Sequence, residues 1–333
     1  MIEIKNTTYQ TVYSTQMFHF TGGLVAFKLP DGKYALAPIR SDGNITFYKF
    51  ETLGQLREIA IVAGALLVGT NETFETNASP ISTWRPINTS SNNGLNSAAD
   101  MWGGISYNAH LNQDSDYQAI GRYISVSMQA VGIRLRDIAL FHHDQLIWAL
   151  EEGRPASIGF SNIPMLDLYL AFHSLATELC SARDHLAKLA AMHIQAKESV
   201  DNMPRLEEWL KKPVHKDHIK EPLVQLMMSA WGSTESPGFL RTLGDLRNKM
   251  IHRQPMSANP ESAMLRTKET ISEFGPIITI RLAPSRIGVL DIDSVPDPFE
   301  TLLNLSHQME QLATQAALIS RYEPKIMSFI VQN

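Results

Sequence analysis

The sequence contains little cysteine and no long hydrophobic run. Cys180 is the single cysteine among 333 residues, which excludes an internal disulfide framework and a zinc site built from several cysteines. Residues 59–69 form the longest apolar run, which is too short to span a bilayer. The first ten residues carry acidic and amide side chains instead of the basic and apolar stretches of a signal peptide. We therefore expect a cytoplasmic protein that does not enter a membrane.

The sequence also lacks an excess of positive charge. The formal net charge is −5 and the isoelectric point is about 6.1, so the chain as a whole does not attract nucleic acid. Any contact with RNA or DNA requires a local basic patch. Hydrophobic residues make up 44% and charged residues 19%, which is typical of a globular protein, and the length allows two domains.

The N-terminal part, residues 1–115, is predicted to be a β-rich α+β region. Residues 24–29 and 33–39 flank Pro30-Asp31-Gly32, a sequence that favours a hairpin turn, and residues 46–50 alternate as a third strand. Residues 53–68 are expected to form a buried helix. Residues 71–100 are rich in Asn, Ser and Thr and are expected to form a long loop that is functional, mobile or conceals short elements.

Residues 116–160 are predicted to be a helical connection, with a helix over 117–150 that breaks near Gly132. Beyond it, apolar residues recur at alternating spacings of three and four, which is typical of helices that pack along one another. The first of these stripes comprises Leu168, Phe172, Leu175, Leu179, Ala182, Leu186 and Leu189. A shorter one comprises Phe239, Leu243, Leu246 and Met250, and the last comprises Leu302, Leu305, Met309, Leu312, Ala316 and Ile319.

The expected fold class is therefore mainly α, with a helical bundle of four to five members over residues 161–333. Residues 206–212 and 223–231 supply its shorter helices. Two β-rich segments, 276–283 and 286–291, predict a hairpin or extended insertion before the last helix.

Residues 243–253 carry the most informative motif. An arginine, Arg247, is followed by the polar Asn248 and precedes His252 by five positions, near the end of an expected helix. This pattern resembles the signature of HEPN domains, which are helical bundles, and the resemblance covers roughly residues 160–330. It implies that Arg247, His252 and Asn248 are catalytic residues of an endoribonuclease. One variant of the family has a tyrosine two positions after the histidine, where this sequence has Gln254.

The chemistry of these side chains suits RNA cleavage without a metal or cofactor. The histidine exchanges protons near neutral pH, and the planar guanidinium binds a phosphate and the charge that grows on it. Five helical positions place Arg247 and His252 about 140° apart around an ideal helix. HEPN domains bring such pairs together by forming homodimers, so the resemblance implies a homodimer with RNA as its substrate. The expected product is a 2′,3′-cyclic phosphate.

Local charge favours the same segment. Four basic side chains lie within residues 241–253 against the single acidic Asp245, and Arg241, Lys249 and Arg253 are the candidate RNA-binding residues. The alternative is that these residues only complement a helix C-terminus.

Asp184 on the first bundle helix is the fourth candidate catalytic residue, because HEPN domains often bring a polar side chain from another helix to the Arg–His pair. The alternative is an exposed or salt-bridged carboxylate.

One competing motif is present: Arg136-Asp137 lies six and seven positions before His142 and His143. Phosphate-binding, dinucleotide-binding and metal-ligand motifs are lacking, so no cofactor or metal is expected. We expect a metal-independent endoribonuclease. The resemblance further implies a toxin–antitoxin or antiphage defence role, with an antitoxin or regulatory protein as a partner. The alternative is a non-enzymatic dimerisation module that binds a nucleotide or a protein.

Overall fold

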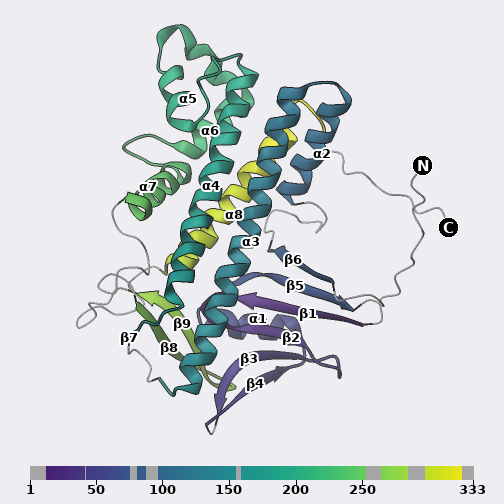
Figure 1. Ribbon diagram of the computed structural model, residues 1–333, viewed down its shortest axis with the longest axis vertical. Coiled ribbons are helices and arrows are strands. Elements are labelled where there is room, and N and C mark those ends of the chain that lie inside the picture. Colours follow the sequence, from purple (N-terminus) through teal and green to yellow (C-terminus); the bar gives the residue numbers. More distant parts are fainter. Residues whose placement is uncertain are drawn as a thin grey trace, which may run out of the picture. The chain divides into compact units, whose positions relative to one another are not determined.

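The computed structural model describes residues 13–41, 43–75, 81–87, 97–154, 159–252, 264–283 and 297–324. The fold is mostly helical and includes a six-stranded antiparallel sheet. It divides into two compact units (Figure 1). The sheet unit comprises Met1–Ile87, Leu135–Pro164 and Pro260–Glu300, and the helical unit comprises Asn88–Arg134, Met165–Asn259 and Thr301–Asn333. Both units are built from separated stretches of chain, whereas the sequence predicted three consecutive regions.

The sheet unit contains an antiparallel sheet in the order β4-β3-β2-β1-β5-β6. Its strands are β1 (Tyr13–Phe20), β2 (Val25–Lys28), β3 (Tyr34–Ser41), β4 (Asn44–Phe50), β5 (Leu67–Glu75) and β6 (Ile81–Pro86). The predicted hairpin of β2 and β3 is confirmed: its turn closes with Leu29 N donating to Lys33 O at 2.8 Å, and Gly32 adopts a positive φ. The third predicted strand is β4, which pairs with β3.

The predicted helix over 53–68 is shorter in the structure. Helix α1 (Leu53–Val62) starts at the N-cap Thr52, whose side chain accepts from Gln55 N. Gly64 then adopts a positive φ, and Ala65 N donates to Ala60 O, a Schellman-type ending. This turn divides the apolar run, so that its second part enters strand β5.

The described part of the loop predicted over 71–100 contains short regular elements, which was one of the three alternatives for this segment. Strands β5 and β6 form a hairpin there, and helix α2 (Ala98–Leu111) begins behind the capping box of Ser97 and Asp100. The polar composition is compatible with strands because the side chains bond across the hairpin. Ser82 Oγ donates to Asn71 Oδ1 at 2.7 Å.

A second, three-stranded sheet in the same unit has the order β7-β8-β9. It consists of β7 (Gly159–Phe160), β8 (Met264–Ser272) and β9 (Gly275–Ala283). Strand β9 covers the first of the two predicted β-rich segments and pairs with β8, which the sequence analysis did not foresee. The second segment, 286–291, lies outside the described residues.

Helix α3 (Ser115–Glu151) is continuous, so the predicted break near Gly132 is wrong. A single glycine weakens a helix interior by only about 1 kcal/mol, and buried neighbours such as Val131 and Leu135 compensate for it. The C-terminal part of α3 packs closely in the sheet unit. A Cβ on Gly23, in the 3₁₀ turn η1 (Thr21–Gly23), would lie 2.5 Å from the carbonyl oxygen of His142.

The helical unit is organised around α4 (Met165–His193). The other helices are α2, the first part of α3, α5 (Met203–Leu210), the 3₁₀ helix η2 (Pro213–Lys220), α6 (Pro222–Trp231), α7 (Phe239–His252) and α8 (Pro298–Leu318). Helix α4 contacts α5, α6 and α7. The predicted stripe on α4 is confirmed, because all seven of its apolar residues are buried. On α8 five of the six are buried, while Ile319 lies beyond the helix end and is exposed.

Buried polar contacts join helices of this unit. Trp102 of α2 donates its Nε1–H to Ala313 O of α8 at 2.9 Å. At the end of α4, His193 Nδ1 lies 3.0 Å from a carboxylate oxygen of Glu221, and its Nε2 lies 3.1 Å from the hydroxyl of Tyr117. Both ring nitrogens of His193 therefore have partners.

Truncating the α4 stripe tests its role in the core. We expect Leu175→Ala to lower the free energy of unfolding by about 2–5 kcal/mol, because the leucine is fully buried. Leu170→Ala on the same helix removes the same atoms from an exposed position and is expected to cost about 0.5 kcal/mol. Urea unfolding followed by circular dichroism measures both, and equal losses would contradict this assignment of the core.

Candidate functional site

A cavity of about 430 Å³ lies between α4 and α7 in the helical unit. Its polar lining includes Arg183 and Asp184 from α4 and Arg241, Arg247 and Asn248 from α7. Four of these five were predicted site residues, and they come from helices separated by many residues in the sequence. The fold therefore brings most of the predicted site together.

Helix α7 places its arginines at the cavity because its apolar residues face α4 and the core. Leu240, Leu243 and Met250 are buried at helical spacing. The chain reverses between α6 and α7, where Gly238 N donates to Trp231 O at 3.0 Å. Arg247 is half-buried and Asn248 is exposed, so both lie beside the buried stripe.

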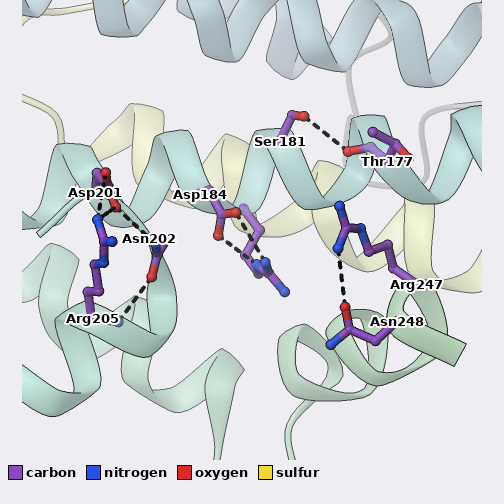
Figure 2. A network of polar contacts seen from close by, with 9 residues as sticks. Thr177, Ser181, Asp184, Asp201, Asn202, Arg205, Arg247 and Asn248 are labelled. Carbon is purple, nitrogen blue, oxygen red and sulfur yellow. Dashed lines mark hydrogen bonds and ion pairs between the residues drawn. The ribbon is translucent and has the colours of Figure 1, made fainter. Parts of the chain in front are cut away.

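Arg247 extends from α7 toward α4, where Thr177 and Ser181 lie (Figure 2). Its Nη1 donates to Oδ1 of Asn248 at 3.2 Å. Within the described part of the chain, no carboxylate forms an ion pair with Arg247. Most of its five N–H donors are therefore available to a ligand.

Asp184 forms a two-point ion pair with its neighbour Arg183 (Figure 2 shows the carboxylate). The Nε and Nη2 atoms of Arg183 donate to the two carboxylate oxygens at 2.9 and 3.2 Å. Burial disfavours the charged guanidinium, but the hydrogen bond and charge of Asp184 outweigh it, so the pKa of Arg183 lies above its ordinary value. The salt-bridged alternative considered for Asp184 is the one observed.

Arg241 of α7 is also held by an ion pair. Its Nη2 donates to Glu207 of α5 at 3.0 Å, and its guanidinium lies 4.4 Å from the ring centre of Trp231. Trp231 donates its Nε1–H to the other oxygen of Glu207 at 3.0 Å, and Lys211 also pairs with this carboxylate. Arg241 thus lines the cavity with its charge largely compensated.

The remaining predicted residues are not brought into the cavity by the described structure. Lys249 is exposed on α7 and is not part of the cavity lining. Helix α7 ends at His252, whose side chain lies outside the described residues, as does Arg253.

The competing motif has structural partners in the sheet unit. Arg136 pairs with Asp137 at 2.9 Å, and His142 is fully buried. His143 donates its Nδ1–H to Gly23 O at 2.9 Å. The side chains of the competing motif therefore take part in packing within the sheet unit, and they do not line the cavity described above.

Sequence reasoning missed Arg183, Glu207 and Trp231 as parts of the site. One available signal was Gly244, a glycine inside a helix, which indicates a close approach by another group. Indeed, a Cβ at this position would lie 2.7 Å from Nη1 of Arg183.

Cys180, the only cysteine, also lines the cavity. Burial raises the pKa of its thiol, while the positive charges of Arg183 and Arg247 oppose that rise. The charge of Asp184 acts in the same direction as burial and raises the pKa of this thiol further.

Comparisons with protein-family models, curated proteins and solved structures found no match. Among the residues described here, no helix is long and apolar enough to cross a membrane. In the same residues, no three His, Cys, Asp or Glu side chains gather as metal ligands. The cavity and its lining residues are therefore the basis for assigning a function.

Low pH should break the ion pair between Glu207 and Arg241, because it protonates the carboxylate of Glu207. Burial tends to raise the pKa of Glu207, but hydrogen bonds from Trp231 and Lys211 and the charge of Arg241 lower it below its ordinary value of 4.5. A lowered pKa in the folded state contributes stability above about pH 4.5, and this contribution is lost as the pH falls through the folded pKa. We expect Glu207→Gln to lower the urea midpoint at pH 7 and to reduce its dependence on pH between 7 and 3.

The exposed neighbour Glu208 provides the matched control. Glu208→Gln removes the same charge one position away and should leave both the midpoint and its pH dependence near those of the unmodified chain. If the two variants behave alike, the ion pair with Arg241 does not stabilise this wall.

Proposed function

We propose that the cavity between α4 and α7 is the active site of a metal-independent endoribonuclease of the HEPN type. The single observation that carries this proposal is the state of Arg247. Of the three arginines in the cavity, Arg183 and Arg241 are each paired with a carboxylate, while Arg247 has no ion pair within the described residues. A cation kept available in a polar cavity is suited to an anionic ligand.

The proposed reaction needs only groups of the chain and the substrate. The ribose 2′-hydroxyl attacks the adjacent phosphorus, a P–O2′ bond forms and the P–O5′ bond breaks. A base takes the 2′ proton, and the leaving 5′ oxygen receives one. The products are a 2′,3′-cyclic phosphate and a 5′-hydroxyl. Arg247 stabilises the charge on the phosphate oxygens, and His252 carries the proton.

The other residues take supporting roles in this proposal. Both oxygens of Asp184 accept hydrogen bonds from Arg183, so we assign Asp184 to positioning instead of proton transfer. Asn248 orients Arg247 through its Oδ1. Arg241 is engaged with Glu207, which leaves the exposed Lys249 as the described residue best placed to attract the RNA backbone.

Two further parts of the proposal come from the resemblance. A homodimer would bring two Arg247–His252 pairs to one cleft, which compensates for their angular separation on a single helix. A role in toxin–antitoxin or antiphage defence would follow, with an antitoxin or regulatory protein as a partner.

Cleavage of labelled RNA by the purified full chain in EDTA tests the proposal. We expect cleavage that ends in a 2′,3′-cyclic phosphate and stops when the ribose at the cleaved position lacks its 2′-hydroxyl. Arg247→Ala and His252→Ala should each lower the rate by about 100-fold or more, because each removes a group that acts in the transition state.

Arg205→Ala is the matched control for Arg247. Arg205 belongs to the same unit, pairs with Asp201 and does not line the cavity, so its removal should leave the rate unchanged. Cleavage that survives both Arg247→Ala and His252→Ala would refute the proposed active site. Binding of RNA without cleavage would instead identify a non-enzymatic binding module.

A further inference from the structure

Arg183 and Gly244 meet where α4 crosses α7. The ideal Cβ position of Gly244 lies 2.7 Å from Nη1 of Arg183, closer than a real Cβ comes to another heavy atom. Glycine weakens a helix interior relative to alanine, yet α7 continues through this position. The missing side chain therefore provides the space that the guanidinium occupies.

The guanidinium of Arg183 is fixed in orientation. Asp184 binds Nε and Nη2, and the ring centre of Trp231 lies 5.9 Å from Cζ. The third nitrogen, Nη1, is turned toward Gly244 and makes no hydrogen bond within the described part of the chain. Arg183 lines the cavity, and its Nη1 has no hydrogen-bond partner among the described residues.

Arg247 lines the same cavity from α7. Arg183 and Arg247 therefore present two guanidiniums to one cavity from two different helices. A phosphodiester has two non-bridging oxygens, and one guanidinium for each binds it in a defined orientation.

We infer that Arg183 of α4 and Arg247 of α7 form a two-arginine site for an RNA phosphodiester, with Gly244 providing the space that Arg183 needs. This inference rests on the proposed function for the identity of the ligand. Arg183 has its charge compensated by Asp184, so it contributes directed hydrogen bonds. Arg247 contributes a charge that forms no ion pair among the described residues, although the carboxylate of Asp245 also lines the cavity. Arg183 therefore binds and orients the substrate.

A double-mutant cycle tests this inference with the full chain. The ligand is an RNA oligonucleotide with 2′-deoxy substitutions throughout the cleaved region, so binding is measured without turnover. We expect Gly244→Ala to weaken binding about tenfold, because the new methyl group displaces the guanidinium. In the Arg183→Ala background, Gly244→Ala should have no further effect, since the group it displaces is gone.

Gly103→Ala in α2 is the matched control. Its Cβ would lie 3.6 Å from Ser125 Oγ, an ordinary contact, and Gly103 is not part of this cavity. Alanine favours a helix at both positions, so helix propensity lowers the melting temperature of neither variant, and the melting temperature of Gly244→Ala is measured beside its binding. A loss of binding by Gly244→Ala at unchanged melting temperature thus excludes a folding defect.

Alkylation of Cys180 gives a second readout that needs no RNA. The chain has one cysteine, so the rate of alkylation against pH reports a single thiol. Arg183→Ala and Arg247→Ala should each raise the pKa of this thiol, because each removes a cation that opposes its rise. Arg205→Ala should not.

The outcomes separate the two proposals. Suppose that Arg247→Ala weakens binding, but Gly244→Ala has the same effect on binding with and without Arg183, or no effect in either case. This result would overturn the two-arginine site and leave the proposed function in place. Coupled binding without cleavage would refute the ribonuclease and leave the site in place. A full chain that binds no RNA oligonucleotide would overturn both.

Discussion

The ion pair between Arg183 and Asp184 is the interaction on which the cavity depends. Helix α4 is buried along most of its length, and a guanidinium inside such a helix is costly unless its charge is compensated. Asp184 supplies the counter-charge from the next position, and Trp231 supplies an aromatic face. The same helix can therefore serve as the centre of the core and as a polar wall, with Leu179 and Leu186 buried on either side of the pair.

The arginines of the cavity differ in whether a carboxylate forms an ion pair with them. This difference matters more than the number of basic residues in the segment. The sequence predicted a basic patch from four cations within residues 241–253. In the structure Glu207 compensates Arg241 through an ion pair that also engages Trp231. Such a pair fixes the wall and contributes little net attraction for a polyanion. Arg247, which has no ion pair among the described residues, is thereby the cation whose charge a ligand can use, and this distinction requires tertiary contacts.

Patterns within one segment were predictable from the sequence, whereas pairings between segments were not. The buried stripe of α4, the hairpin of β2 and β3, and α7 with Arg247 all follow from local spacing or turn chemistry. The hairpin of β5 and β6 was missed because cross-strand hydrogen bonds make its polar residues compatible with strands. Asp184 was identified, but its partner Arg183 and the role of Gly244 depend on the crossing of two helices.

Glycines inside helices illustrate the same limit. Gly132 was taken to break α3, yet the helix is continuous, so glycine alone does not predict a break. At Gly121 a Cβ would lie 3.4 Å from backbone atoms of Ser106, and the glycine allows α2 and α3 to approach closely. At Gly244 the approaching group is a guanidinium. A gap at a helix crossing that admits backbone serves packing alone. A gap that admits a paired and oriented cation at a cavity wall also places that cation beside the cavity, which is why Gly244 enters the proposed binding site.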